Sequence, residues 1–140
     1  MSEKSLLPLS ILVVDDSDDS AQSTAELLSL SGHAVRVASC GADALRNAAV
    51  ETPDVILLDI AMPEMTGWEV ASRIRQACRE KQPLIVAVTG YGTEADRWRS
   101  ADAGCDLYMV KPVEPMTLLK LLGWVQKSVA TRTRVIVTTR

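Results

Sequence analysis

The feature that most limits the possible folds is the run Val-Ile-Leu-Leu at residues 55–58. An aspartate flanks this run on each side, Asp54 and Asp59. Four consecutive branched aliphatic side chains are typical of a strand buried on both faces, which occurs inside a parallel sheet covered by helices. Met62-Pro63 and Thr66-Gly67 then break the strand and begin a helix. Ligands bind beyond the carboxyl ends of strands in open parallel sheets, so Asp59 stands where a reactive group would stand. For an isolated aspartate, the alternative is a helix cap or a solvated strand end.

Strand and helix patterns alternate along the rest of the chain. Besides the central strand, apolar runs predict strands at residues 10–14, 34–38, 83–88 and 107–110, with 34–38 as a half-exposed edge strand. Capping residues and helical spacing predict helices at about 18–30, 41–50, 66–80, 93–103 and from 115 onward. Five strands alternating with five helices predict an α/β fold, a doubly wound five-stranded parallel sheet joined by right-handed crossovers.

The chain of 140 residues corresponds to about one domain. We expect an N-terminal extension at 1–9, the domain at 10–130 and a flexible tail at 131–140, for which a linker remnant and an added strand remain alternatives. The net charge of −3 is small and acidic, which does not suggest a nucleic-acid surface.

The remaining composition indicates a cytoplasmic protein with no membrane segment. The first ten residues are too short for a signal-peptide core, and no apolar run approaches the length of a membrane span. Three scattered cysteines fit reduced thiols better than disulfides or a zinc site. His33 is the only histidine, which excludes a histidine-based metal cluster and leaves a surface or strand-edge position for this residue.

Polar residues follow four of the predicted strands: Asp15-Asp16, Asp59, Thr89 and Lys111. In a parallel sheet these four strand ends lie on one rim, and carboxylates packed there need a compensating charge. A hard divalent cation such as Mg²⁺ and the lysine would supply it. Acids, cation, hydroxyl and ammonium together suit a transferable phosphoryl group, with one carboxylate as nucleophile. Each residue alone also has an ordinary structural explanation, but the joint pattern favours a site.

The motifs that carry these residues resemble those of response-regulator receiver domains. They are Ile-Leu-Val-Val-Asp15-Asp16, Asp59-Ile-Ala-Met-Pro63-Glu-Met-Thr-Gly67, Ala-Val-Thr89-Gly90 and Tyr108-Met-Val-Lys111-Pro112. The resemblance covers about residues 10–130 and implies a flavodoxin-like fold with strand order 2-1-3-4-5. The turn after Thr89 also looks like receivers of hybrid histidine kinases.

The resemblance also implies roles for individual residues. Asp59 would be the phosphoacceptor, with Lys111 paired to the phosphoryl group. Mg²⁺ would be held by Asp16, Asp59 and the backbone carbonyl of Ala61, oriented by Asp15. Thr89 and Tyr108 would form the switch, in which Thr89 approaches the phosphoryl group and Tyr108 turns inward. Two neighbours, Ala61 and Tyr91, would tune the lifetime of the phosphorylated state, and both suggest slow self-hydrolysis.

The implied function is a signalling receiver that takes a phosphoryl group from a histidine kinase or a histidine phosphotransfer protein. It would act stoichiometrically, not as an enzyme, and would signal to a protein target through the fourth helix, fifth strand and fifth helix, without binding nucleic acid directly. Alternatives are a phosphorelay shuttle or the excised receiver of a hybrid kinase and, less favoured, a small aspartate-nucleophile phosphatase. An inactive receiver-like module is disfavoured because all key side chains are present, and the GxGxxA-like turn at 90–95 is in the wrong unit for dinucleotide binding.

Overall fold

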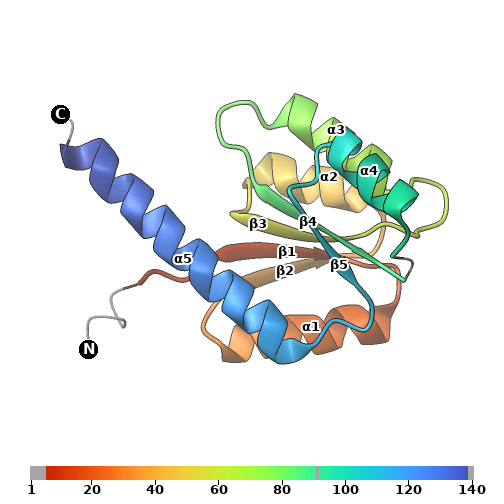
Figure 1. Ribbon diagram of the computed structural model, residues 1–140, viewed down its shortest axis with the longest axis horizontal. Coiled ribbons are helices and arrows are strands. Elements are labelled where there is room, and N and C mark those ends of the chain that lie inside the picture. The colour runs from red at the N-terminus through yellow and green to blue at the C-terminus, as the bar shows by residue number, and fades with distance from the viewer. Residues whose placement is uncertain (1–5, 91, 139–140) are drawn as a thin grey trace.

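The computed structural model describes the backbone at residues 6–90 and 92–138 and the side chains at 6–90 and 92–129. Five strands alternate with five helices, as Figure 1 shows. The strands are β1 (Ser10–Val14), β2 (Ala34–Ala38), β3 (Val55–Asp59), β4 (Leu84–Thr89) and β5 (Leu107–Val110). The helices are α1 (Asp18–Leu30), α2 (Gly41–Val50), α3 (Gly67–Ala77), α4 (Glu94–Ala103) and α5 (Pro115–Thr138).

All neighbouring strands are parallel, and the sheet has the order β2-β1-β3-β4-β5. The implied strand order is therefore confirmed. The central position of β3 follows from its sequence, since all five of its residues are buried, whereas β2 lies at an edge and has only one buried residue. A strand covered on both faces must be apolar on both, which is why the least polar runs occupy the middle of the sheet.

Alternation along each strand divides the apolar side chains between two cores. Leu12, Ile56 and Ile85 belong to the core beneath α2 and α3. Ile11, Leu57 and Val86 belong to the core on the other face, beneath α1 and α5. Figure 1 shows this division, with α1 and α5 on one side of the sheet and α2, α3 and α4 on the other. The two layers hold the strand ends of the rim in fixed relative positions.

Hydroxyl side chains begin the helices that follow β1, β3 and β4. Ser17 accepts a hydrogen bond from the backbone N–H of Ser20 at 3.4 Å, and Thr66 and Thr93 cap α3 and α4 in the same way. Gly104 ends α4 in the left-handed region at φ 107°. Thr93 and Gly104 bound the helix predicted at about 93–103, and each hydroxyl satisfies a backbone N–H at a helix start.

Both ends of the domain differ from the predicted boundaries. The helix α5 continues to Thr138, so most of the expected flexible tail at 131–140 is helical, because no glycine or proline after Gly123 interrupts it. At the other end, Leu9 is buried in the core beneath α1 and α5, and its N–H donates to Nδ1 of His33 at 3.1 Å. No helix in the described part of the chain is both long and apolar enough to cross a membrane.

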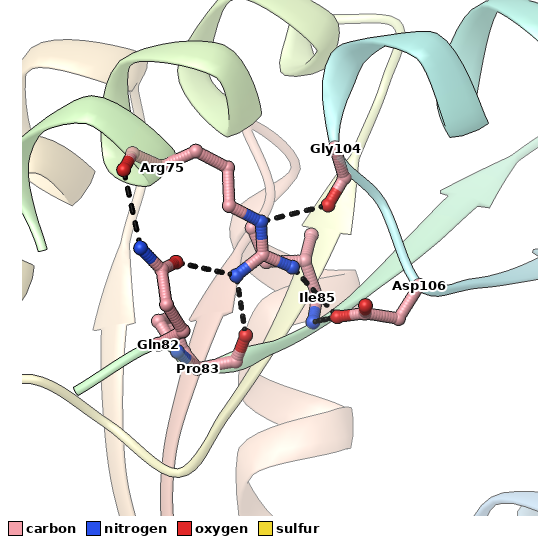
Figure 2. A network of polar contacts seen from close by, with 6 residues as sticks. All are labelled: Arg75, Gln82, Pro83, Ile85, Gly104 and Asp106. Atoms are coloured by element: carbon pink, nitrogen blue, oxygen red, sulfur yellow. Dashed lines mark hydrogen bonds and ion pairs between the residues drawn. The ribbon is translucent and has the colours of Figure 1, made fainter. Parts of the chain in front are cut away.

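At the amino ends of the strands, opposite the rim, Arg75 contacts three segments of the chain (Figure 2). Its guanidinium donates to the carbonyls of Gly104 and Pro83 and pairs with Asp106 at 2.6 Å. The Asp106 carboxylate also accepts the N–H of Ile85 at 2.9 Å. This network joins the end of α3 to the starts of β4 and β5, and so fixes the strands whose far ends reach the rim.

Candidate functional site

The carboxylates predicted from the sequence meet at the carboxyl ends of β1 and β3. These strands are neighbours, with Val14 in register with Leu58, so the residues that follow them lie side by side. One carboxylate oxygen from each of Asp15, Asp16 and Asp59 lies within 4.8 Å of the others. Asp15 and Asp59 are buried, and Asp16 is exposed, so the cluster has one side open to solvent.

Backbone groups hold these carboxylates in place. The N–H of Ser17 donates to Oδ1 of Asp15 at 2.9 Å, and the N–H of Ala61 donates to Oδ1 of Asp59 at 3.2 Å. The start of α3 packs against the end of β3 through Gly67, where an added Cβ would lie 2.5 Å from the backbone oxygen of Asp59. Only glycine permits this close approach, which sets the distance between the helix and the phosphoacceptor candidate.

Lys111 reaches the cluster from β5, two strands away. Its Nζ lies 3.5 Å from Oδ1 of Asp59, and its backbone N–H donates to the carbonyl of Thr89 at 2.7 Å. The structure therefore brings together Asp15, Asp16, Asp59 and Lys111, as the pattern of strand ends predicts. The ammonium compensates part of the negative charge that the packed carboxylates create.

Burial raises the pKa of the Asp59 carboxyl to about 6. The Lys111 ammonium opposes this shift, the Asp15 carboxylate adds to it, and the N–H of Ala61 again lowers the pKa. Desolvation and like charge disfavour the ionised form, so a cation at this position would be strongly favoured. The electrostatics thus match a site that works with a bound cation.

The donor set of the cluster fits Mg²⁺. This ion takes oxygen ligands, commonly one or two carboxylates together with retained waters, and the exposed position of Asp16 leaves room for water. The three carboxylates, with one oxygen of each within 4.8 Å of the others, supply such ligands.

The side chains of Thr89 and Tyr108, the two residues of the expected switch, lie on the sheet face opposite to α1 and α5. Tyr108 is in register with Ala87, and Thr89 follows two residues later on β4, so all three side chains share the face covered by α4. Thr89 is buried, and the ring of Tyr108 is partly exposed with Cζ of Arg97 5.5 Å from its centroid.

Of the two residues expected to tune the lifetime, the structure describes one. Ala61 is exposed and follows Asp59 by two residues, and its N–H donates to the Asp59 carboxylate. Tyr91 lies outside the described residues, so its expected effect on the lifetime of the phosphorylated state stays a prediction.

Sequence reasoning missed a cavity of about 500 Å³ next to the cluster. Asp15, Asp59 and Lys111 are among the lining residues, together with Ser20 and Thr24 of α1 and apolar residues of the sheet, of the segment after β5 and of α5. The signal was present in the sequence: the first two turns of α1 carry only small side chains on the side that faces the sheet, too small to fill the space above it.

Comparisons with known proteins agree with this geometry. The family model described as the response regulator receiver domain matches residues 11–123, more than half of the chain. An uncharacterized 14.6 kDa protein in the sodA1 3' region of Leptolyngbya boryana is 34% identical over 119 residues, which covers 85% of this chain and 91% of that protein. The protein PilH of Pseudomonas aeruginosa is 33% identical over 113 residues, which covers 81% of this chain and 93% of PilH.

A similar solved structure is that of the chemotaxis protein CheY4 of Vibrio cholerae, crystallized at pH 4.0. It has a TM-score of 0.79 and 33% sequence identity, and the match covers 84% of this chain and 98% of that chain.

Proposed function

Because the chain belongs to the response-regulator receiver domains, which are signalling modules activated by phosphorylation, we propose that Asp59 accepts the phosphoryl group. The observation that carries this assignment is the position of the Asp59 carboxylate. It is buried at the end of the central strand, within 4.8 Å of two further carboxylates and 3.5 Å from the Lys111 ammonium.

In the proposed reaction an oxygen of the Asp59 carboxylate attacks the phosphorus of a phosphohistidine donor. The phosphorus–nitrogen bond of the donor breaks, its electron pair returns to the imidazole, and an acyl phosphate forms on Asp59. Lys111 pairs with the incoming phosphoryl oxygens, and Asp15, Asp16 and the carbonyl of Ala61 would hold Mg²⁺ with Asp59. When bound, Mg²⁺ supplies positive charge that neutralises the phosphoryl oxygens.

The direct test is labelling by a small acyl phosphate in the presence of Mg²⁺. We expect intact mass to increase by one phosphoryl group in the wild type, with no increase in Asp59→Asn or when Mg²⁺ is removed by a chelator. Asp102→Asn on the exposed surface of α4 serves as the matched control and should be labelled normally. Labelling of Asp59→Asn to the wild-type level would contradict the assignment, and repeated turnover of a phosphomonoester would indicate a phosphatase instead.

Receiver domains exchange phosphoryl groups with histidine kinases or phosphotransfer proteins and act on downstream targets. We propose that this chain signals through α4, β5 and α5, without direct contact with nucleic acid. Large apolar side chains are exposed on these three elements: Trp98, Leu107, Val110, Met116 and Trp124. Exposed apolar side chains gathered on neighbouring elements favour a protein partner, and the acidic net charge of −3 disfavours nucleic acid. The free thiols of all three cysteines support a cytoplasmic location.

Receiver domains are signalling switches, not classical enzymes, and we propose that this one loses its phosphoryl group slowly. Hydrolysis of the acyl phosphate needs a water in line with the Asp59 oxygen. Ala61, whose N–H donates to Oδ1 of Asp59, has an exposed methyl group, which can neither orient the water nor accept its proton. The phosphorylated state would then last long enough to serve as a signal, or to be handed on in a phosphorelay.

A further inference from the structure

The helix α4 has little apolar contact with the rest of the domain, and of its residues only the last, Ala103, packs against the core beneath α2 and α3. Among its ten residues, all of which the structure describes, the single buried side chain is that of Ser100, which is 2% exposed. Trp98, the largest apolar residue of the helix, is 71% exposed. Most helices in proteins are held by the packing of an apolar face, so the position of α4 depends on a few specific contacts.

The strongest of these contacts comes from Trp68, in the first turn of α3. Its indole Nε1–H donates to Oγ of Ser100 at 2.9 Å. The guanidinium of Arg99 lies over the same indole, with Cζ 4.1 Å from the ring centroid. Breaking the hydrogen bond would leave a buried hydroxyl without this partner, and moving the helix would also separate the cation from the ring.

The opposite side of α4 has a weaker contact of the same kind. Arg97 lies over the ring of Tyr108 on β5 at 5.5 Å. Residues 97 and 99 point to opposite sides of a helix because two residues span about 200°. The helix is therefore held between an indole on α3 and a phenol ring on β5, the latter belonging to the residue predicted to turn inward in the switch.

Both ends of the Trp68–Ser100 bond lead back to the phosphoacceptor. Trp68 directly follows Gly67, whose N–H donates to the carbonyl of Ile60 at 3.0 Å, next to Asp59. Ser100 belongs to the helix that residues 90–93 connect to Thr89 at the end of β4. A displacement of α4 relative to α3 that follows a movement of Thr89 would stretch or break this bond.

We propose that Trp68 is a positioning residue that fastens α4 to α3 through Ser100 and so opposes the rearrangement that accompanies phosphorylation of Asp59. The inference rests on the proposed function, because the rearrangement is driven there by the phosphoryl group. In the arrangement described here, with the ring of Tyr108 beside Arg97, the bond is made. Removing the Trp68–Ser100 hydrogen bond destabilises this arrangement and favours the phosphorylated arrangement by the same free energy.

The first measurement concerns the position of α4 and does not involve phosphorylation. Trp68→Phe keeps an aromatic ring under Arg99 but removes the N–H donor, and Ser100→Ala removes the acceptor. We expect hydrogen exchange of the α4 amides to be faster in both variants by about three- to tenfold, the effect of one net hydrogen bond. Exchange of the α4 amides in the double variant should be no faster than in either single variant, since the same hydrogen bond is lost in all three. Trp98→Phe, which alters an exposed tryptophan of the same helix, should leave exchange unchanged.

The second measurement uses beryllofluoride with Mg²⁺ as a stable mimic of the phosphoryl group. We expect Trp68→Phe and Ser100→Ala to bind it about three- to tenfold more tightly than the wild type, with Trp98→Phe unchanged. Unchanged exchange of the α4 amides in both variants would overturn the inference. Faster exchange with unchanged beryllofluoride affinity would also overturn it, because the bond would then hold the helix without affecting the site. If the wild type neither binds beryllofluoride nor is labelled, the proposed function fails, and the exchange measurement still decides whether Trp68 fastens α4.

Discussion

The carboxyl group of Asp59 illustrates how one residue can weaken the fold and serve the site. Its pKa is raised by burial to about 6 in the folded chain, against about 3.9 in an unfolded one. The folded protein therefore binds more protons than the unfolded chain between these two values, and the free energy of unfolding falls as the pH rises through this window. Above about pH 6 the full cost of the buried charge is present.

We expect Asp59→Asn to increase the free energy of unfolding of the magnesium-free protein by about 1–3 kcal/mol at pH 8. The gain should shrink between about pH 6 and pH 4 and vanish below, because the wild-type carboxyl is then protonated in both states. Urea unfolding of both proteins across this pH range, with a chelator present, measures it. A gain that does not depend on pH would show that charge burial is not its cause.

Ala61 is the second residue with a specific expectation. Its side chain is exposed beside the acidic cluster and offers no hydrogen-bonding group. We expect Ala61→Asn to lose its phosphoryl group several-fold faster than the wild type, because an amide can orient the attacking water. Decay of the labelled protein after removal of the donor gives the rate. Ala61→Val, which adds bulk without polarity, is the matched control, and equal acceleration in both variants would contradict the argument.

At the scale of the elements, Arg75 stabilises the amino ends of β4 and β5, at the end of the sheet opposite the site. Its guanidinium contacts the carbonyls of Gly104 and Pro83, the side chain of Gln82 and the carboxylate of Asp106, as Figure 2 shows. A planar group with several donors can satisfy all four partners at once, which a lysine ammonium cannot do.

We expect Arg75→Ala to lower the free energy of unfolding by about 2–4 kcal/mol, since the partly buried partners lose several hydrogen bonds together. Arg75→Lys should recover only a small part of that loss. Arg79→Ala is the matched control, because Arg79 is exposed and makes one long hydrogen bond of 3.4 Å to the carbonyl of Gln76. Denaturant unfolding compares the four proteins, and equal stability of Arg75→Ala and Arg79→Ala would remove the network from the account of the fold.

At the scale of the whole molecule, the proposed phosphorylation of Asp59 would have to affect the proposed binding surface on α4, β5 and α5. The Lys111 ammonium connects Asp59 to the end of β5, residues 90–93 connect Thr89 at the end of β4 to α4, and Arg97 of α4 lies over the ring of Tyr108 on β5. The two flanks of α4 carry aromatic and polar contacts in place of an apolar stripe, so this helix is the element best able to move.

We therefore expect beryllofluoride with Mg²⁺ to shift the amide resonances of α4, β5 and the first turns of α5 as well as those of the loop after Asp59. The resonances of α2 and of β2, which lie at the other edge of the sheet, should change little. Two-dimensional NMR of the protein with and without beryllofluoride distinguishes these regions. Shifts confined to the loop after Asp59 would mean that the signal does not leave the site.

Local sequence determined the strands, the helix starts and the polar rim. Apolar runs identify β1, β3 and β4 because a strand buried on both faces can carry little else, and Ser17, Thr66 and Thr93 mark helix starts through a contact with their own backbone neighbours. The acidic cluster followed once the strands were known to be parallel. These features depend on residues close together in the chain, or on a rule that applies to every parallel sheet.

The tertiary structure alone decided the contacts that join distant residues. Arg75 and Asp106 are 31 positions apart in the sequence, and Trp68 and Ser100 are 32 positions apart. The burial of Leu9 beneath α1 and α5 and the raised pKa of Asp59 also depend on how the layers pack. Side chains of these types are common on exposed helices and loops, so nothing local distinguishes them. Their role arises only when folding removes water and leaves each polar group dependent on the partner beside it.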